Sequence, residues 1–248
     1  TGKTKSVLQS DQAQKKYGTT VNEKHADARV RLAHAGQKEQ PVPKGDAERV
    51  NKYLKAAAQG DANAQLMLGA IYHEGDGVPQ DYEKALKWYQ KAAEQGRADA
   101  QYQLGMMYER GEGIAQNFSD ALKWYEQAAE GGNAEAQFSL ALIYHKGEGV
   151  LQNNEQAAKW FLKSAEQGTA MAQFHMAMMY DSGEGVCRND DEAAKWLVKS
   201  AEKGIAQAQF MLGERYRTGQ GVEQNDDEAV AWYLKAADQE HADAQMNL

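Results

Sequence analysis

The stretch DANAQLMLGAIYHEGDGVPQDYEKALKWYQKAAEQG, residues 61–96, decides the fold of this 248-residue chain, because it recurs four more times without a gap. Repeats 1 to 5 occupy residues 61–96, 97–132, 133–168, 169–204 and 205–240. All five tryptophans fall at one position of the repeat, namely Trp88, Trp124, Trp160, Trp196 and Trp232. Such a period predicts a solenoid, in which each repeat buries its apolar face against its neighbours.

Within each repeat the pattern predicts a helix, a turn and a second helix. Ala64, Leu68 and Tyr72 share one helical face, and the glycines at 75 and 77 then interrupt the pattern. The second helix starts at an aspartate or asparagine, whose side chain accepts hydrogen bonds from free backbone N–H groups. These residues are Asp81, Asn117, Asn153, Asn189 and Asn225. We therefore expect an all-α chain with helices at 62–74 and 81–95, recurring every 36 residues, and no β-sheet.

The two ends of the chain depart from the repeat. Residues 25–60 keep its alanines, a leucine and a glycine but lose the glycine pair and the tryptophan. A more polar terminal repeat is typical of a cap, so we interpret 25–60 as a degenerate N-terminal capping repeat. Residues 1–24 show no period and are interpreted as a flexible tail. Residues 241–248 start another first helix, which predicts that the protein continues and that its uncovered face allows end-to-end contact.

Composition excludes several classes of function. Residues 1–45 carry a charge balance of +5, which leaves −13 for residues 46–248, and an acidic body argues against nucleic-acid binding. No stretch approaches the roughly 18 apolar residues of a membrane-spanning helix, so no membrane insertion is expected. Cys187 is the only cysteine, which rules out an internal disulfide and a zinc site built on thiolates.

No catalytic, cofactor or metal site is predicted. The six histidines form no pair four residues apart on one helix, which is the spacing that a helical metal site needs. Cys187 occupies a turn position that varies freely between repeats. The Gly-x-Gly pairs follow helices rather than strands, so they are interpreted as turns and not as phosphate-binding loops.

The repeat resembles the Sel-one-like repeat (SLR) family, a branch of the tetratricopeptide-like superfamily. The resemblance rests on Ala64-Gln65, Leu68-Gly69, Tyr72, Gly75-Asp76-Gly77-Val78, Asp81, Ala85, Trp88-Tyr89, Ala92-Ala93 and Gly96. It implies a right-handed α/α superhelix whose first helices line the concave face and which serves as an adaptor or scaffold. It also implies a bacterial protein, with the exported or cell-envelope location favoured over the cytoplasm. This chain lacks the cysteines of the disulfide-rich members.

The candidate binding surface is a set of positions that vary between repeats while staying on one face of the first helix, which we call the groove stripe. Methionines and a leucine lie at its centre and charged residues at its margins, a mixture that suits a peptide or helical ligand. The alternative is that these positions are solvated and vary freely. The candidate contact residues are Met67, Gln103, Met106, Arg110, Ser139, Leu142, Lys146, His175, Met178, Met211 and Glu214.

The leading hypothesis is a monomeric, non-enzymatic adaptor that binds a protein or peptide segment in its concave groove. A second hypothesis is a hydrolase or small-ligand protein acting on cell-wall material, which family resemblance suggests. A convergent acid, base and nucleophile would favour it. The third is a structural spacer, which a polar and featureless concave face would favour.

Overall fold

The computed structural model describes residues 44–246, all helices and turns, with no strand in that range. The helices are α3 (Lys44–Ala58), α4 (Ala62–Glu74), α5 (Tyr82–Glu94), α6 (Ala98–Arg110), α7 (Phe118–Glu130), α8 (Ala134–Lys146), α9 (Asn154–Glu166), α10 (Ala170–Ser182), α11 (Asp190–Glu202), α12 (Ala206–Thr218), α13 (Asp226–Ala237) and α14 (Ala242–Met246). The predicted spans are confirmed to within about one residue. The predicted tail and the first half of the predicted cap lie outside the described residues.

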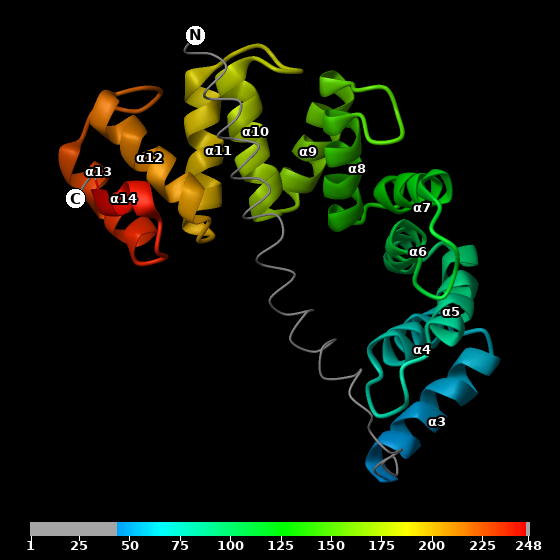
Figure 1. Cartoon of the computed structure of the whole chain (residues 1–248). Helices are drawn as coiled ribbons and strands as arrows, with labels where there is room; N and C mark the ends of the chain where they lie inside the picture. The colour runs from blue at the N-terminus through cyan, green and yellow to red at the C-terminus, as the bar shows by residue number, and fades with distance from the viewer. Residues whose placement is uncertain (1–43, 247–248) are drawn as a thin grey trace. The chain divides into compact units, whose positions relative to one another are not determined.

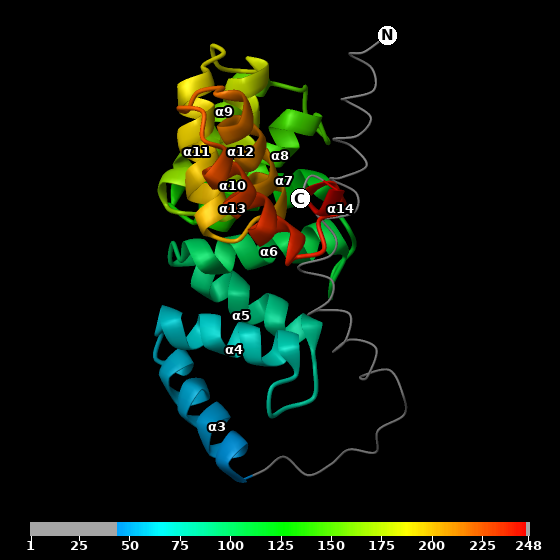
Figure 2. The same cartoon turned by 90° about the vertical axis from the view of Figure 1, so that its left-hand side faces the viewer.

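The helices stack in chain order. The two helices of a repeat pack against each other, and each second helix then packs against the first helix of the next repeat (Figure 1, Figure 2). The predicted solenoid is confirmed. Alanine dominates the fully buried positions, among them Ala85, Ala100, Ala121 and Ala136, so the helix backbones approach one another closely.

The turn between the two helices is held by backbone hydrogen bonds. Gly75 ends α4 at a φ of 73°, in the left-handed region that favours glycine, and its N–H donates to the Ile71 carbonyl. The backbone N–H of Asp81 donates to the Tyr72 carbonyl at 2.8 Å. The Asp81 side chain then accepts from the N–H of Lys84, as predicted for an N-cap. The same geometry recurs in repeats 2 to 5.

Each tryptophan packs against core clusters that its own repeat and the one before it form. Trp88 lies against a core cluster formed by α3 and α4 that includes Val50 and Leu68. In four repeats a lysine three residues further along covers the outer face of the indole, where the ring attracts a cation. The indole therefore fills the interface between repeats, and in these four repeats a lysine ammonium group covers its outer face.

A tyrosine in the second helix crosses the first helix of its own repeat at a glycine. A Cβ atom added to Gly105 would lie 2.6 Å from the Tyr125 ring, and one added to Gly213 would lie 2.7 Å from Tyr233. The Tyr125 hydroxyl is anchored by donating to Glu109 at 2.6 Å. In repeats 3 and 4 the tyrosine is replaced by Phe161 and Leu197, and the glycine by Ala141 and Ala177. The two positions therefore change together.

A buried glutamine clamps each repeat to the next. Gln137 Nε2 donates to the Ala129 carbonyl at 3.0 Å, across the connection between α7 and α8. Its Oε1 accepts from Gln167 Nε2 at 2.8 Å, from the end of α9. The bond from the glutamine Nε2 to a backbone carbonyl eight residues earlier recurs at Gln65, Gln101, Gln173, Gln209 and Gln245. In repeat 4, Lys203 stands where repeat 3 has Gln167 and bonds Gly168, so Gln173 Oε1 is buried without a hydrogen-bond partner.

Replacing Lys203 with glutamine should stabilise the protein. The new amide reaches both Gly168 and Gln173 Oε1, as Gln167 reaches its two acceptors, and a satisfied buried acceptor is worth about 1 kcal/mol. Urea unfolding should therefore shift to higher concentration. Lys203→Ala is the control, because it removes the lysine without supplying a donor. If both variants gained the same free energy of unfolding, the glutamine hydrogen bond would not be the cause of the gain.

Gly105→Ala should destabilise the protein although alanine is the better helix former. Overpacking against Tyr125 costs about 1–3 kcal/mol, which exceeds the ~1 kcal/mol that alanine gains in helix propensity. In a Tyr125→Leu background, which reproduces the pairing of repeat 4, the same substitution should stabilise. The four free energies of unfolding form a double-mutant cycle, and an effect of one sign in both backgrounds would rule out the packing explanation.

Candidate functional site

The groove stripe lies on the first helices α4, α6, α8, α10 and α12. Met67 on α4 is 42% exposed, and Arg110 and Lys146 are exposed at the ends of α6 and α8. Seven of the predicted residues are half-buried: Gln103, Met106, Ser139, Leu142, Met178, Met211 and Glu214. The stripe is thus accessible along its length, but its side chains also pack against the repeat core.

The apolar centre of the stripe belongs partly to the core. Leu142 and Met211 pack against the largest buried cluster, which runs from α8 to α13 and contains Phe161 and Leu197. Burial raises the pKa of the Tyr102 hydroxyl of the preceding repeat, and Ser139, which lies near this hydroxyl, lowers it by less. Contacts with the core therefore fix the apolar atoms at the centre of the stripe, so they would lose little conformational entropy if a ligand covered them.

The prediction that His175 is a contact residue on the surface is wrong. Its side chain is only 7% exposed, and its ring is stacked at 4.7 Å on Phe161 with an interplanar angle of 2°. Phe138 from the preceding first helix lies 5.7 Å away. Burial lowers the pKa of His175 to about 4, and the nearby charges of His145 and Lys146 act in the same direction. His175 is therefore neutral at pH 7 and serves as an aromatic packing residue.

The basic residues of the stripe have acidic neighbours. Arg110 lies 3.8 Å from Glu112, and Lys146 lies 3.4 Å from Glu148. Glu112 also accepts from His73 Nε2 at 2.8 Å. Its pKa is lowered because the hydrogen bond to His73 and the charges of His73 and Arg110 outweigh the opposing effect of burial. The positive charges of Arg110 and Lys146 are therefore largely balanced by acidic side chains within each turn.

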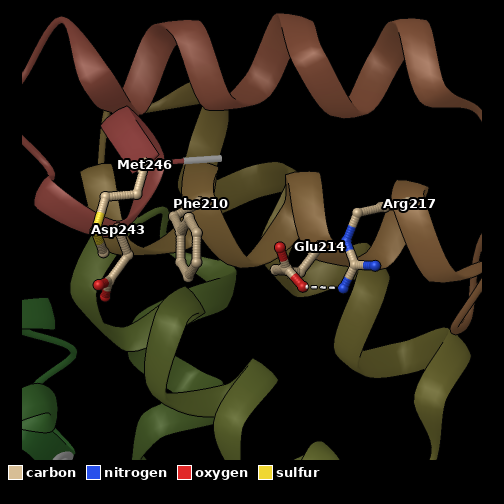
Figure 3. A pocket seen from close by; sticks show the side chains of 5 residues that line it. All are labelled: Phe210, Glu214, Arg217, Asp243 and Met246. Atoms are coloured by element: carbon tan, nitrogen blue, oxygen red, sulfur yellow. Dashed lines mark hydrogen bonds and ion pairs between the residues drawn. The ribbon is translucent and has the colours of Figure 1, made fainter. Parts of the chain in front are cut away.

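A cavity of about 610 Å³ lies at the C-terminal end of the stripe, between α12 and α14. Figure 3 shows the Phe210 ring between the Glu214–Arg217 ion pair on one side and Asp243 and Met246 on the other. Arg217 lies 2.6 Å from Glu214, whose other carboxylate oxygen accepts from the Tyr233 hydroxyl. Only Glu214 of this set was predicted, although Arg217 lies three residues after it on the same helix face.

Sequence reasoning also missed a buried ion pair between repeats 4 and 5. Arg215 is 4% exposed and stands where other repeats have an apolar side chain. Its guanidinium lies 2.6 Å from Asp181 and donates to the Asp190 carbonyl at 3.3 Å. A charged residue at an otherwise apolar position of the repeat was the available signal. The pair is structural, because the guanidinium is enclosed by the two repeats that it joins.

Residues 44–246 contain no group of three or more histidine, cysteine, aspartate or glutamate side chains that could hold a metal ion. Cys187 is exposed in its turn. None of the helices in this range is long and apolar enough to cross a bilayer.

Comparison with known proteins agrees with this geometry. The sequence model of the Sel1 repeat matches residues 26–61, 62–96, 98–133, 134–169, 170–205 and 206–241. A protective antigen of uropathogenic Escherichia coli with an SLR fold is 39% identical, with a TM-score of 0.76; the match covers 79% of this chain and 42% of the antigen.

A Sel1 repeat protein from Oxalobacter formigenes is 35% identical, with a TM-score of 0.74, over 81% of this chain and 83% of that chain. The comparison with curated proteins found no match. The family model covers 26–61 as a full repeat, whereas its capping role stays a prediction. On six matched repeats and two similar structures, the chain belongs to the Sel1 repeat family.

Proposed function

We propose that this protein is a non-enzymatic adaptor that binds a segment of a partner protein along the groove stripe. Sel1 repeat proteins are generally protein-interaction scaffolds, so a protein partner is the expected ligand class. The observation that carries the proposal is the row of half-exposed apolar side chains on successive first helices. Met106, Leu142 and Met178 occupy the same position in repeats 2, 3 and 4.

The chemistry of the stripe defines the ligand. Methionine side chains adapt to differently shaped apolar surfaces, so the central row suits a helix or extended segment with apolar anchors spaced by the repeat. Arg110 and Lys146 already lie beside Glu112 and Glu148. An acidic ligand residue would therefore have to displace Glu112 or Glu148 from these cations. We expect the apolar anchors to contribute most of the binding free energy.

The other two hypotheses find less support. A hydrolase needs a nucleophile, a base and donors for the developing charge in one pocket. The one histidine of the stripe is buried against Phe161 and neutral, which removes the most plausible base. A pure spacer needs no apolar row, whereas the stripe carries Met67 at 42% exposure in repeat 1 and half-buried methionines in repeats 2 and 4.

Replacing Met106 and Met178 with glutamate should abolish partner binding. The substitution places two charges in the row that the partner's apolar side chains must cover, and loss of central anchors typically weakens binding by about 2 kcal/mol or more each. Partners recovered with the full chain as bait are titrated by calorimetry against this variant. Met67→Glu, at an exposed site, is the second variant and keeps the test valid if the double variant unfolds.

The matched control is charge reversal of Lys87, Lys123 and Lys159, which are exposed on the second helices. This variant should retain its affinity, because those lysines lie off the stripe. Binding that survives the stripe variants and disappears in the lysine variant would place the site on the second helices and refute the proposal.

A further inference from the structure

In repeats 2, 4 and 5 the turn touches the start of the second helix in the repeat before it. A Cβ atom added to Gly113 would lie 2.7 Å from the backbone of Tyr82, the first residue of α5. Glycine is needed at this position because backbone meets backbone. Equivalent contacts, within 3.0 Å, join Gly185 to Asn154 and Gly221 to Asp190.

A side chain from the first helix completes this contact. In repeat 4 the end of the Met179 side chain lies 3.0 Å from the Cβ position of Gly185. In repeat 5 the Arg215 guanidinium donates to the Asp190 carbonyl at 3.3 Å. Ile71, Met107, Met179 and Arg215, which share this position of the repeat, are all buried, at 4% exposure or less.

The junction between repeats 2 and 3 is open at this contact. A Cβ atom added to Gly149 would meet nothing within 4 Å. Ile143, at the position that is buried in the other four repeats, is only half-buried. Phe118, the first residue of α7, is 58% exposed, and Leu151 in the facing turn is 92% exposed. These observations agree that the turn after α8 stands away from the start of α7.

The charges at this junction differ from those at the junction of repeats 1 and 2 and at that of repeats 4 and 5. His73 bonds Glu112 at 2.8 Å across the junction of repeats 1 and 2, and Asp181 accepts from Gln220 at 3.4 Å across that of repeats 4 and 5. The equivalent positions at the open junction are Glu109 and Glu148. Glu109 accepts from the Tyr125 hydroxyl at 2.6 Å and Glu148 lies 3.4 Å from Lys146, so the bond that helps to close the other two junctions is absent here.

We propose that this open junction binds a partner segment in which an apolar side chain lies next to a lysine or arginine. The apolar side chain covers Phe118, Ile143 and Leu151. The cation lies between Glu109 and Glu148 and donates to these carboxylates, as Gln220 donates to Asp181. Single exposed apolar residues are common on protein surfaces, but here they border a gap with two like charges beside it. The site lies on the edge formed by the turns, and the proposal is independent of the groove stripe.

The test selects ligands without assuming a partner. The full chain is panned with a phage-displayed library of random 12-residue peptides, and enriched peptides are synthesised and titrated by fluorescence anisotropy. Peptides with an apolar residue beside a basic one should be enriched. Leu151→Asp and Glu148→Lys should each weaken their binding by about tenfold or more, as expected for a central anchor. Both side chains are largely exposed, so these variants keep the fold.

Matched controls come from the closed junction of repeats 3 and 4. Cys187 and Glu184 occupy the repeat positions of Leu151 and Glu148, and both are exposed. Cys187→Asp and Glu184→Lys should leave the affinity within about twofold, as is usual for surface substitutions away from a site.

Several results would overturn the proposal. They are the absence of enriched peptides, enrichment of acidic peptides, and equal losses in the two pairs of variants. Peptides that respond to Met67→Glu but not to Leu151→Asp bind the stripe and also count against it. If the chain instead self-associates in sedimentation experiments and Leu151→Asp makes it monomeric, a second copy occupies the junction and the peptide proposal is wrong.

Discussion

The rest of the structure depends on the contact between each second helix and the first helix of the next repeat. Ordering 36 residues costs on the order of 50 kcal/mol at about 1.5 kcal/mol per residue, and two short helices bury too little apolar surface to offset it. The interface between repeats supplies the missing burial. The glutamine clamp and the tryptophan both lie at this interface, so the most strictly repeated side chains are those that join neighbours.

Positions outside this framework are free to vary, and the candidate binding surfaces are found there. Packing requires alanine where backbones approach and glycine where a tyrosine ring crosses a helix. The exposed positions of the stripe, such as Met67, and of the turns, such as Leu151, carry no such requirement. Their differences between repeats, such as Met106 against Glu214 or Leu151 against Cys187, change the surface without changing the stack.

Local signals in the sequence predicted the helices, their caps and the turn glycines nearly completely. These features depend on residues within one repeat, such as the Asp81 side chain and the Lys84 N–H. The burial of His175 was not predictable in this way, because it depends on Phe161 and Phe138 from other helices. The open junction was not predictable from the sequence either, because it depends on a contact between two repeats. Gly149 keeps the sequence motif, and only the missing contact with α7 distinguishes it.

The central claim is that stability comes from interfaces between repeats, and its most direct measurement is urea unfolding of fragments with increasing numbers of repeats. Residues 61–96 alone should be unfolded, and 61–132, 61–168, 61–204 and 61–240 should gain free energy of unfolding with each added interface. The account predicts the smallest gain for the step to 61–168, which adds the open junction. A folded single repeat, or a stability that does not rise with the number of repeats, would contradict it.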